Sequence, residues 1–371
     1  MKKQILSLIF LCMIVLACAS RSMAQEYTLS DLYQVALKNS EKIKIAEENL
    51  YIAQMGKSKA WSLLIPRLTA FGTYNHFTES KYGAPPAYSN VIIQPYESGN
   101  WGVRADQAFS LSARELDALK IAGQSITKSG YDLDAARTDY LLAVASAYYD
   151  VLKAKKTLEI SAANMARLTQ YGDSAEKRVK VGELTKTALL RADGELSGAR
   201  AEYLRATNSL RMARAALVRV SGIEDEFRLV EEKSPLSDEY ELGQMQKTAL
   251  EYRTDLKSYD MQTQMAAQQV KYARGAFWPN LGLFAIYNRA DQNPASPTFN
   301  RESILAGVSL TFPFFEGGLR LAELREAQAR ERQAKQAYDD MKKSVDIEVR
   351  GVYLELDRSE EHTSELQSLS H

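Results

Sequence analysis

The sequence LDALKIAGQSITKSGYDLDAARTDYLLAVASAYYDVLKAKKTLEISAANMARL, residues 116–168, repeats its apolar side chains in alternating steps of three and four. A 3.5-residue repeat sustained over so many turns is typical of a coiled-coil helix. At 1.5 Å per residue the stretch would form a rod of roughly 80 Å, too long for one helix of a compact domain. The repeat positions are Leu116, Leu119, Gly123, Ile126, Gly130, Leu133, Arg137, Tyr140, Val144, Ala147, Val151, Ala154, Leu158, Ser161, Met165 and Leu168.

A second stretch keeps the same rhythm and predicts the partner of this helix. Its positions are Leu189, Ala192, Leu196, Ala199, Tyr203, Ala206, Leu210, Ala213 and Leu217. The two stretches meet at a short turn near Gly182, so together they predict a helical hairpin over residues 113–220. A length of 371 residues would otherwise suggest two or three compact domains. The long periodicity argues against that arrangement.

The first 24 residues predict a secretory signal peptide. Lys2 and Lys3 precede an apolar run from Ile5 to Ala19, and Ser22-Met23-Ala24 provides a cleavage site of small residues. Cleavage as a lipoprotein at Cys18 is the alternative. Both cysteines of the chain, Cys12 and Cys18, lie in this segment, so cleavage after Ala24 would leave neither a disulfide nor a thiol nucleophile.

The last 14 residues read RSEEHTSELQSLSH and break the helical pattern before them. The apolar positions Val345, Val349, Val352 and Leu356 have no continuation beyond Asp357. The string also resembles a translated sequencing adapter. We therefore expect residues 358–371 to be a non-native tail, with a frayed polar end of the native chain as the alternative.

Charge and hydropathy exclude two classes of protein. The chain has 47 basic and 47 acidic residues, and this balance gives no indication of nucleic-acid binding. No apolar run of 18 residues follows the signal segment, so we expect no transmembrane helix. Any insertion into a membrane would then use β-strands. Residues 101–111 have the alternating pattern of such a strand, but a half-buried sheet would show the same pattern.

The chain repeats itself at a spacing of 213 residues. The matching pairs are Ala36-Leu37 with Ala249-Leu250, Ala60 with Ala273, Pro66 with Pro279, Leu68 with Leu281, Phe71 with Phe284, and Tyr74-Asn75 with Tyr287-Asn288. A repeat of this kind predicts two copies of one structural unit.

The first predicted repeat, residues 25–221, contains a helix, two strands and the hairpin; the strands are expected at about 67–76 and 101–111. A connector follows at 222–243. The second repeat, 244–357, contains a helix, strands at about 280–289 and 303–314, and an outgoing helix at 317–357 whose return helix is missing. Pro313, Gly317 and Gly318 are expected to form the bend from the last strand into that helix.

In its order of motifs the chain resembles the TolC-like outer-membrane efflux proteins. The resemblance rests on Ile65-Pro66 and Trp278-Pro279 before two strands, the run Phe312-Pro313-Phe314-Phe315-Glu316-Gly317-Gly318, Ala147-Tyr148-Tyr149, and the hairpin turn. It implies a mainly helical protein with long coiled-coil hairpins. It also implies that each of three identical chains contributes four strands to one β-barrel in the outer membrane, with the helices in the periplasm.

The resemblance also implies a docking site at the hairpin turn. In such proteins this turn contacts a periplasmic adaptor (membrane fusion) protein, and the matching residues here are Arg178, Val181, Gly182, Leu184 and Thr185. Glu183 departs from the family pattern, which commonly has an apolar residue there. A purely structural role is the alternative: Gly182 permits a left-handed turn and Thr185 caps the next helix.

No residue pattern predicts catalysis, a cofactor or a metal site. His362 and His371 lie in the expected tail, and His76 is interpreted as a polar residue at a strand end. The function predicted is a passive outer-membrane exit duct of a tripartite efflux pump or type I secretion system, driven by an inner-membrane pump. The alternative is a periplasmic coiled-coil adaptor without a pore. That alternative leaves the strands and the duplication unexplained.

Overall fold

A computed structural model describes residues 25–83, 91–224, 226–231, 241–295 and 300–369. The expected signal peptide and part of the expected connector, residue 225 and residues 232–240, lie outside these ranges. The chain divides into two compact units, one made of residues 1–45 and 136–239 and the other of residues 46–135 and 240–371. Each unit is described separately below.

The first unit is built around the hairpin. Its elements are β1 (Gln25–Tyr27), α2 (Leu29–Asn39), the second part of α4 (Arg114–Lys180), α5 (Lys186–Ser221) and β6 (Phe227–Leu229). A capping box begins α2, because the Thr28 hydroxyl accepts from the Asp31 N–H and the Asp31 carboxylate accepts from the Thr28 N–H. The core of the unit consists of Leu32, Ala36, Val144, Ala147, Tyr148, Val151, Leu217, Ile223 and Phe227.

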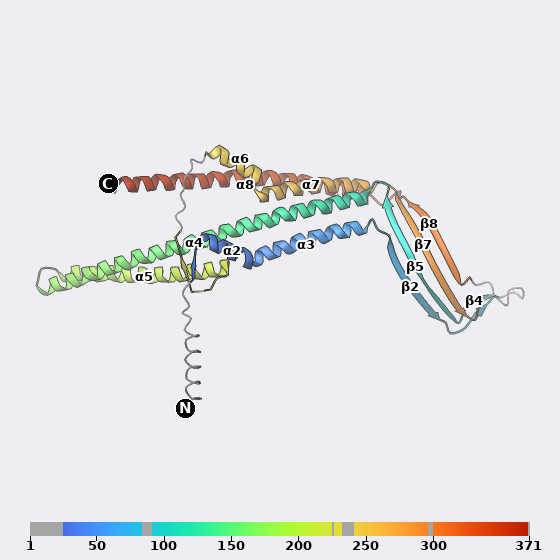
Figure 1. The fold of residues 1–371 in the computed structure, drawn as a ribbon, viewed down its shortest axis with the longest axis horizontal. Helices are drawn as coiled ribbons and strands as arrows, with labels where there is room; N and C mark the ends of the chain where they lie inside the picture. Colours follow the sequence, from blue (N-terminus) through green and yellow to red (C-terminus); the bar gives the residue numbers. More distant parts are fainter. Residues whose placement is uncertain (1–24, 84–90, 225, 232–240, 296–299, 370–371) are drawn as a thin grey trace, which may run out of the picture. The chain divides into compact units, whose positions relative to one another are not determined.

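Helix α5 carries every residue of its 3.5-residue repeat at a buried or half-buried position. On α5 the buried positions Ala192, Ala199 and Ala206 are seven residues apart, and Leu217 is fully buried. Small side chains at this spacing let a second helix approach closely. The hairpin expected over 113–220 is observed as α4 and α5, which are labelled in Figure 1.

The connector after the hairpin is more ordered than the sequence suggested. Residues 222–243 were expected to be a polar connection, but β6 pairs in parallel with β1. The buried ring of Phe227 anchors this pairing in the core, and the hydroxyl of Tyr148 donates to the Val230 carbonyl over 2.7 Å. The sequence does not indicate a partner strand for this segment, because β1 lies far away in the chain.

The second unit contains a four-stranded antiparallel sheet. Its order is β2–β5–β7–β8, formed by β2 (Arg67–His76), β5 (Glu97–Ser110), β7 (Asn280–Asn293) and β8 (Glu302–Thr311). The four strands run side by side in Figure 1. A small hairpin, β3 (Lys81–Tyr82) with β4 (Ile92–Gln94), lies in the connection between β2 and β5. The other elements of the unit are most of α3 (Glu41–Ser62), the first part of α4, α6 (Leu242–Tyr252), α7 (Thr254–Gly275) and α8 (Leu319–Leu369).

Helices α7 and α8 pack against each other through Val270, Ala273 and Ala327. The helix expected at the start of each repeat is in fact two helices. The first is interrupted at Ser40, where ψ is 119°, and the second at Arg253, where ψ is 124°. Neither residue is Gly or Pro, so these positions carry no residue type that indicates a break. Every residue of α6 and α7 lies 213 positions after its counterpart in α2 and α3.

Several element ends differ from the expected ranges. Strand β7 ends at Asn293 rather than 289, because its last residues pair with the first residues of β5. Strand β5 begins at Glu97 rather than 101, because β2 and β7 flank its first residues on both sides. Strand β8 ends at Thr311 rather than 314. Pro313 lacks an N–H, and β8 is an outer strand of the sheet that the described residues form. Helix α8 begins at Leu319 and continues past Asp357 to Leu369, because Glu, Leu and Gln favour a helix even without an apolar stripe.

Among the described residues, no helix combines the length and the hydropathy that crossing a membrane requires.

Candidate functional site

The sheet of the second unit has one strongly apolar face. Its register places Val103 opposite Ala70 on one side and opposite Tyr287 on the other, so these side chains point the same way. This apolar face carries Leu68, Ala70, Tyr74, Trp101, Val103, Leu283, Tyr287, Ile304, Val308 and Leu310. Its side chains are not covered: Leu68 is 72% exposed and Ile304 is 82% exposed. A continuous apolar face of this kind indicates a contact with lipid or protein.

The opposite face holds most of the polar residues of the strands, together with Phe71, Phe284, Ile286 and Leu305. It carries Arg67, Thr69, Thr73, Arg104, Asp106, Asn288, Ser303, Ser309 and Thr311. Arg104 and Asp106 form an ion pair of 2.8 Å on this face. Two glycines make room for aromatic rings, since a Cβ at Gly102 would lie 2.9 Å from the Phe71 ring and one at Gly307 would lie 2.5 Å from the Phe284 ring.

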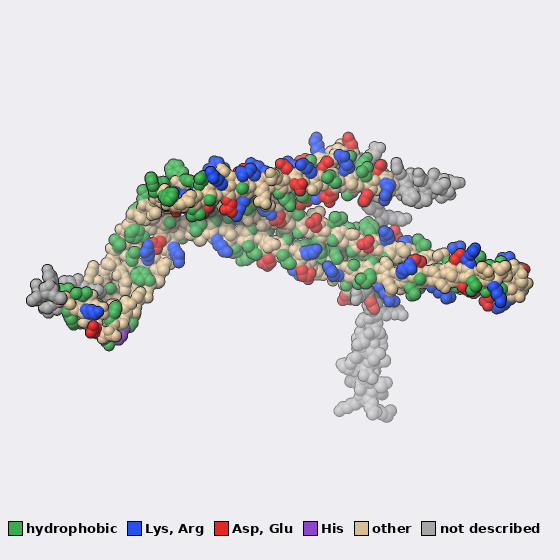
Figure 2. Space-filling model, turned by 180° about the vertical axis from the view of Figure 1, so that it is seen from behind, with side chains coloured by type: hydrophobic (Ala, Val, Ile, Leu, Met, Phe, Trp, Pro, Cys, Tyr) green, Lys and Arg blue, Asp and Glu red, His purple; other side chains and the backbone are tan. Residues whose placement is uncertain are grey.

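Exposed aromatic side chains mark both ends of the apolar face. At the helix end they are Trp61, Phe277, Trp278, Phe312, Phe314 and Phe315, and toward the far end they are Tyr74, Tyr82 and Tyr96. Figure 2 shows hydrophobic side chains gathered where the strands give way to the helices, whereas charges of both signs alternate along the helices. Aromatic residues at two levels with apolar strands between them are typical of membrane strands.

The expected bend between strand and helix is present at Pro313, Gly317 and Gly318. The two glycines have φ of +59° and +88°, which favours glycine because a Cβ is strained there. Arg320 holds the bend, since its guanidinium donates to the Pro313 carbonyl and lies 2.5 Å from the Glu316 carboxylate. An equivalent bend lies before α4, where Ala113 has φ +57°. The sequence does not predict it, because no glycine marks the position.

A half-open cavity of about 640 Å³ lies beside the helix end of the sheet. It is lined in part by Arg67, Asp106, Gln107, Arg114 and Tyr272. The Gln107 amide donates to the Leu63 carbonyl over 3.0 Å, and the Arg114 guanidinium lies 4.1 Å from the centre of the Tyr272 ring. Charged and polar side chains therefore form part of the cavity wall.

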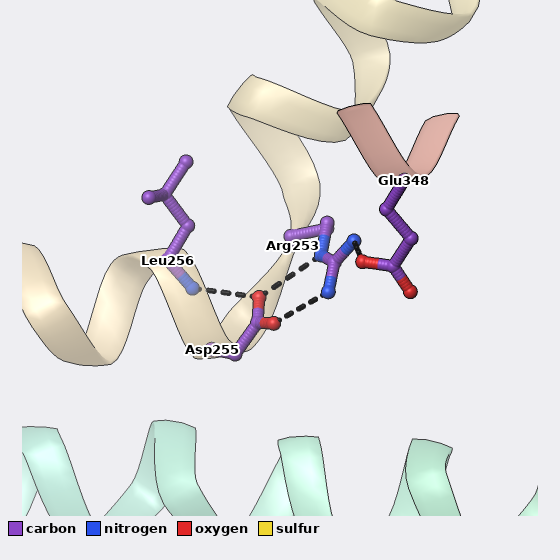
Figure 3. A network of polar contacts seen from close by, with 4 residues as sticks. All are labelled: Arg253, Asp255, Leu256 and Glu348. Carbon is purple, nitrogen blue, oxygen red and sulfur yellow. Dashed lines mark hydrogen bonds and ion pairs between the residues drawn. The ribbon is translucent and has the colours of Figure 1, made fainter. Parts of the chain in front are cut away.

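A polar network joins the break between α6 and α7 to α8 (Figure 3). Arg253 makes two hydrogen bonds to Asp255, of 3.1 and 2.7 Å, and one of 2.6 Å to Glu348. Its hydrogen bond to Asp255 raises the pKa of Arg253 further above neutrality. Burial raises the pKa of Asp255, but hydrogen bonds from Arg253 and from the Leu256 N–H outweigh it, so that this pKa lies below its ordinary value. The sequence pattern gave no signal for this network.

The predicted docking residues lie together at the tip of the hairpin. Gly182 has φ +80°, and the Arg178 carbonyl accepts from the N–H of Glu183 over 2.9 Å. The Thr185 hydroxyl caps α5 by accepting from the Ala188 N–H. The structural roles considered for Gly182 and Thr185 are therefore observed. The sequence alone could not place the Arg178 side chain, which forms an ion pair of 3.1 Å with Glu183.

Two properties leave the tip open to a partner. Val181 is 71% exposed, and Leu184 is half-buried. Arg178 and Glu183 lie beside Val181 in the sequence of the tip, and their side chains are more than half exposed.

Within the described part of the chain, no group of three His, Cys, Asp or Glu side chains could hold a metal ion.

Comparison with protein families gives one match over most of the chain. The family described as "Outer membrane efflux protein" matches residues 32–223 and 246–368. The relatives include the outer membrane efflux protein BepC of Brucella suis, 22% identical over 322 residues, which cover 86% of this chain and 67% of BepC. The alkaline protease secretion protein AprF of Pseudomonas aeruginosa is 24% identical over 225 residues, or 58% of this chain and 46% of AprF.

The fold also matches solved structures. The outer membrane protein VceC of Vibrio cholerae superimposes with a TM-score of 0.72 at 20% identity, over 85% of this chain and 75% of VceC. This similarity confirms the predicted class of fold, with long helical hairpins and a four-stranded sheet. The relatives named here are described as efflux and secretion proteins and not as enzymes.

Proposed function

Because this chain belongs to the outer membrane efflux protein family, we propose that it is the outer-membrane channel subunit of a tripartite efflux pump or a type I secretion system. The protein is located in the outer membrane, with its helical portion in the periplasm. In the proposed role it is a passive duct, and an inner-membrane pump supplies the energy. BepC is named for efflux and AprF for alkaline protease secretion, so both kinds of system remain within the proposal.

The two-faced sheet is the observation that carries this proposal. Its apolar face suits outer-membrane lipid, and its opposite face, with Arg104 and Asp106, suits a water-filled lumen. In a bilayer every backbone N–H and C=O must be hydrogen-bonded, so a sheet with open edges has to close. The pattern therefore supports a membrane strand over one from a water-soluble sandwich, whose apolar face would be covered by a second layer.

The open edges of the sheet support a homotrimer. Strands β2 and β8 are the outer strands, and they run antiparallel to one another. Four strands are too few to enclose a lumen, since barrels start at about eight strands. Three copies, as the family resemblance implies, would contribute twelve strands and leave no edge unpaired.

Membrane fractionation of the full-length protein tests the channel proposal. We expect the protein in the outer-membrane fraction, and we expect it to migrate as a trimer in SDS gels until it is heated. Deleting the gene should also lower export of the substrate handled by the cognate pump. A protein that fractionates as a soluble periplasmic monomer would instead support the adaptor alternative and contradict the channel.

We further propose that the tip of the hairpin binds a periplasmic adaptor protein. The exposed Val181 side chain and the half-buried Leu184 offer an apolar contact, and Arg178 offers a charged one. Such a contact desolvates Val181, so introducing a charge at this position should oppose it strongly.

The variant Val181→Asp tests this docking role. We expect it to abolish co-purification of the adaptor and to reduce export, while the heat-sensitive trimer forms as in the wild type. Ile160→Asp is the matched control, because Ile160 is equally exposed on α4 but far from the tip along the helix. Normal adaptor binding by Val181→Asp would exclude the tip as the docking site.

A further inference from the structure

The two repeats of the chain correspond residue by residue, with two constant offsets. Elements before the loop of each repeat are 213 positions apart, as α3 and α7 show. Elements after the loop are 205 positions apart, because β2 pairs Arg67 with Asp106 and β7 pairs Asn280 with Thr311. Helix α4 begins at Arg114 and α8 at Leu319, which gives the same offset of 205.

Backbone geometry supports the second offset independently. It makes Ala113 the counterpart of Gly318, and these residues have φ of +57° and +88° immediately before their helices. It also makes Gly102 the counterpart of Gly307, and both glycines face a phenylalanine ring on the neighbouring strand. The two halves of the sheet therefore repeat one structure.

One contact of the first repeat has no counterpart in the second. Strand β5 continues to Ser110 because its last residues pair with Asn280 and the following residues of β7, and the Leu111 N–H then donates to the Pro279 carbonyl. Strand β8, the counterpart of β5, stops at Thr311, and among the described residues no strand pairs with its outer edge.

The exposure of equivalent side chains shows the same difference. Gln107 and Ser110 of β5 are only 8% and 7% exposed. Their counterparts, Phe312 and Phe315, are 48% and 86% exposed. Aromatic side chains thus stand open to solvent at positions that the same fold covers in its other half.

We propose that β2 of a second copy of this chain fills this place, in the register that β7 has against β5. Applying the two offsets, Phe315 of one copy lies opposite Arg67 of the next, Leu310 opposite Gly72, and Ala306 opposite His76. Residues 312–315 then extend β8. The inference rests on the proposed channel function and adds to it the residue-by-residue register of the seam between copies.

The backbone of both edges agrees with this register. Hydrogen-bonded residues alternate along an antiparallel strand. The Phe77 N–H donates to the Tyr96 carbonyl, so the odd-numbered residues of β2 face β5 and the even-numbered ones face the open edge. The Ala290 N–H donates to the Arg301 carbonyl, which likewise leaves the even-numbered residues of β8 facing outward. The proposed seam joins even-numbered residues to even-numbered ones.

Pro313 fits the seam for the same reason. As an odd-numbered residue it faces β7, beyond the end of the β7–β8 pairing, so its missing N–H is not one that the seam requires. A register shifted by one residue would place the outward-facing even-numbered residues of β8 opposite odd-numbered residues of β2, whose N–H and C=O groups point toward β5. It would also turn the apolar face of one copy toward the polar face of the next.

Side-chain sizes are complementary along the proposed seam. On the apolar face the large Leu310 meets Gly72, and the large Phe312 meets Ala70. A Cβ at Gly72 has no neighbour closer than the Trp101 Cβ at 3.9 Å, so space for Leu310 is available beside it. Opposed large and small residues pack without a void or a clash.

Paired cysteines in the full-length protein test the register. The double variant Leu310→Cys/Gly72→Cys places the two thiols directly opposite each other across the seam. Oxidation in outer membranes should yield disulfide-linked dimers and trimers on heated, non-reducing gels. The matched controls Leu310→Cys/Ala70→Cys and Leu310→Cys/Tyr74→Cys shift one thiol by two residues on the same face. They should link roughly fivefold less, because Cα atoms more than about 7 Å apart do not form a disulfide without backbone movement.

The outcomes separate this inference from the proposed function. Efficient disulfide linkage in either shifted pair would overturn the register and leave the channel proposal intact. The same conclusion would follow if none of the three pairs were linked while the heat-sensitive trimer persists. Loss of the trimer in the wild-type protein would overturn the channel proposal itself. The single variants Leu310→Cys and Gly72→Cys should remain unlinked, and a linked product from either would show that the pairs report chance collisions.

Discussion

At the scale of single residues, the two repeats stabilise the same backbone break with different chemistry. Ser40 is buried, and its hydroxyl accepts from the Ile43 N–H over 3.3 Å to begin α3. Its counterpart Arg253 instead reaches sideways, to Asp255 and to Glu348 on α8. The ion pairs of Arg253 therefore connect the break between α6 and α7 to the neighbouring helix α8. They are sensitive to protonation of the carboxylates.

Acid should remove the stabilisation that Asp255 provides. Its pKa is lower in the folded protein than in the unfolded chain, so the carboxylate stabilises the fold above the ordinary value of about 3.9, and the effect is lost as the pH falls through the folded pKa. Asp255→Asn should thus lower the urea midpoint at about pH 7 and hardly change it at about pH 2. The exposed Asp150→Asn serves as the control. An equal loss at both pH values would contradict this assignment.

At the scale of elements, the bends that join strands to helices are the points where the backbone conformation is most demanding. Ala113 and Gly318 occupy the same position of the two repeats with positive φ. A residue with a Cβ is strained in this conformation, and glycine is not. The first bend therefore carries strain that the second avoids.

Exchanging these two residue types should change stability in opposite directions. Gly318→Ala should lower the free energy of unfolding, and Ala113→Gly should raise it, each by roughly 0.5–1 kcal/mol, because the strain exceeds the change in freedom of the unfolded chain. Urea unfolding followed by circular dichroism measures both. Gly194→Ala, in the ordinary helix of α5 with open space around it, should be stabilising. Gly318→Ala and Gly194→Ala acting in the same direction would argue against strain at the bend.

The sequence predicts the long elements well because their periodicity is carried by many residues. The heptad positions on α5 are the buried ones, and β2 occupies the expected range 67–76. Isolated features escaped prediction. A break at Ser40 or Arg253 depends on one ψ angle, and β6 depends on a distant strand at the N-terminus. At the hairpin tip, the sequence predicts a turn near Gly182 and the family resemblance implies the docking residues, whereas the ion pair of Arg178 with Glu183 follows from side-chain geometry.

At the scale of the whole molecule, the two faces of the sheet should respond differently to the same charge. Val308→Arg puts a cation on the apolar face, where burial in lipid costs roughly 2–4 kcal/mol near the centre of a bilayer. We expect it to deplete the protein from the outer membrane and to lower the temperature at which the trimer dissociates. Ser309→Arg lies one residue further along, on the polar face, and should be tolerated. Equal behaviour of the two variants would mean that the apolar face does not meet lipid.

The unequal offsets of the two repeats bear on how such a protein can evolve. By the two offsets of 213 and 205, the loop of the first repeat is eight residues longer than the loop of the second, and it includes β3 and β4. In a ring of three chains, long and short loops would alternate around the outer rim. An ancestor with a single repeat would close the same ring from six identical copies. A mutation in its loop would then change all six loops at once. Fusion of two repeats would let mutations change half of the loops of such a ring while the other half stays the same.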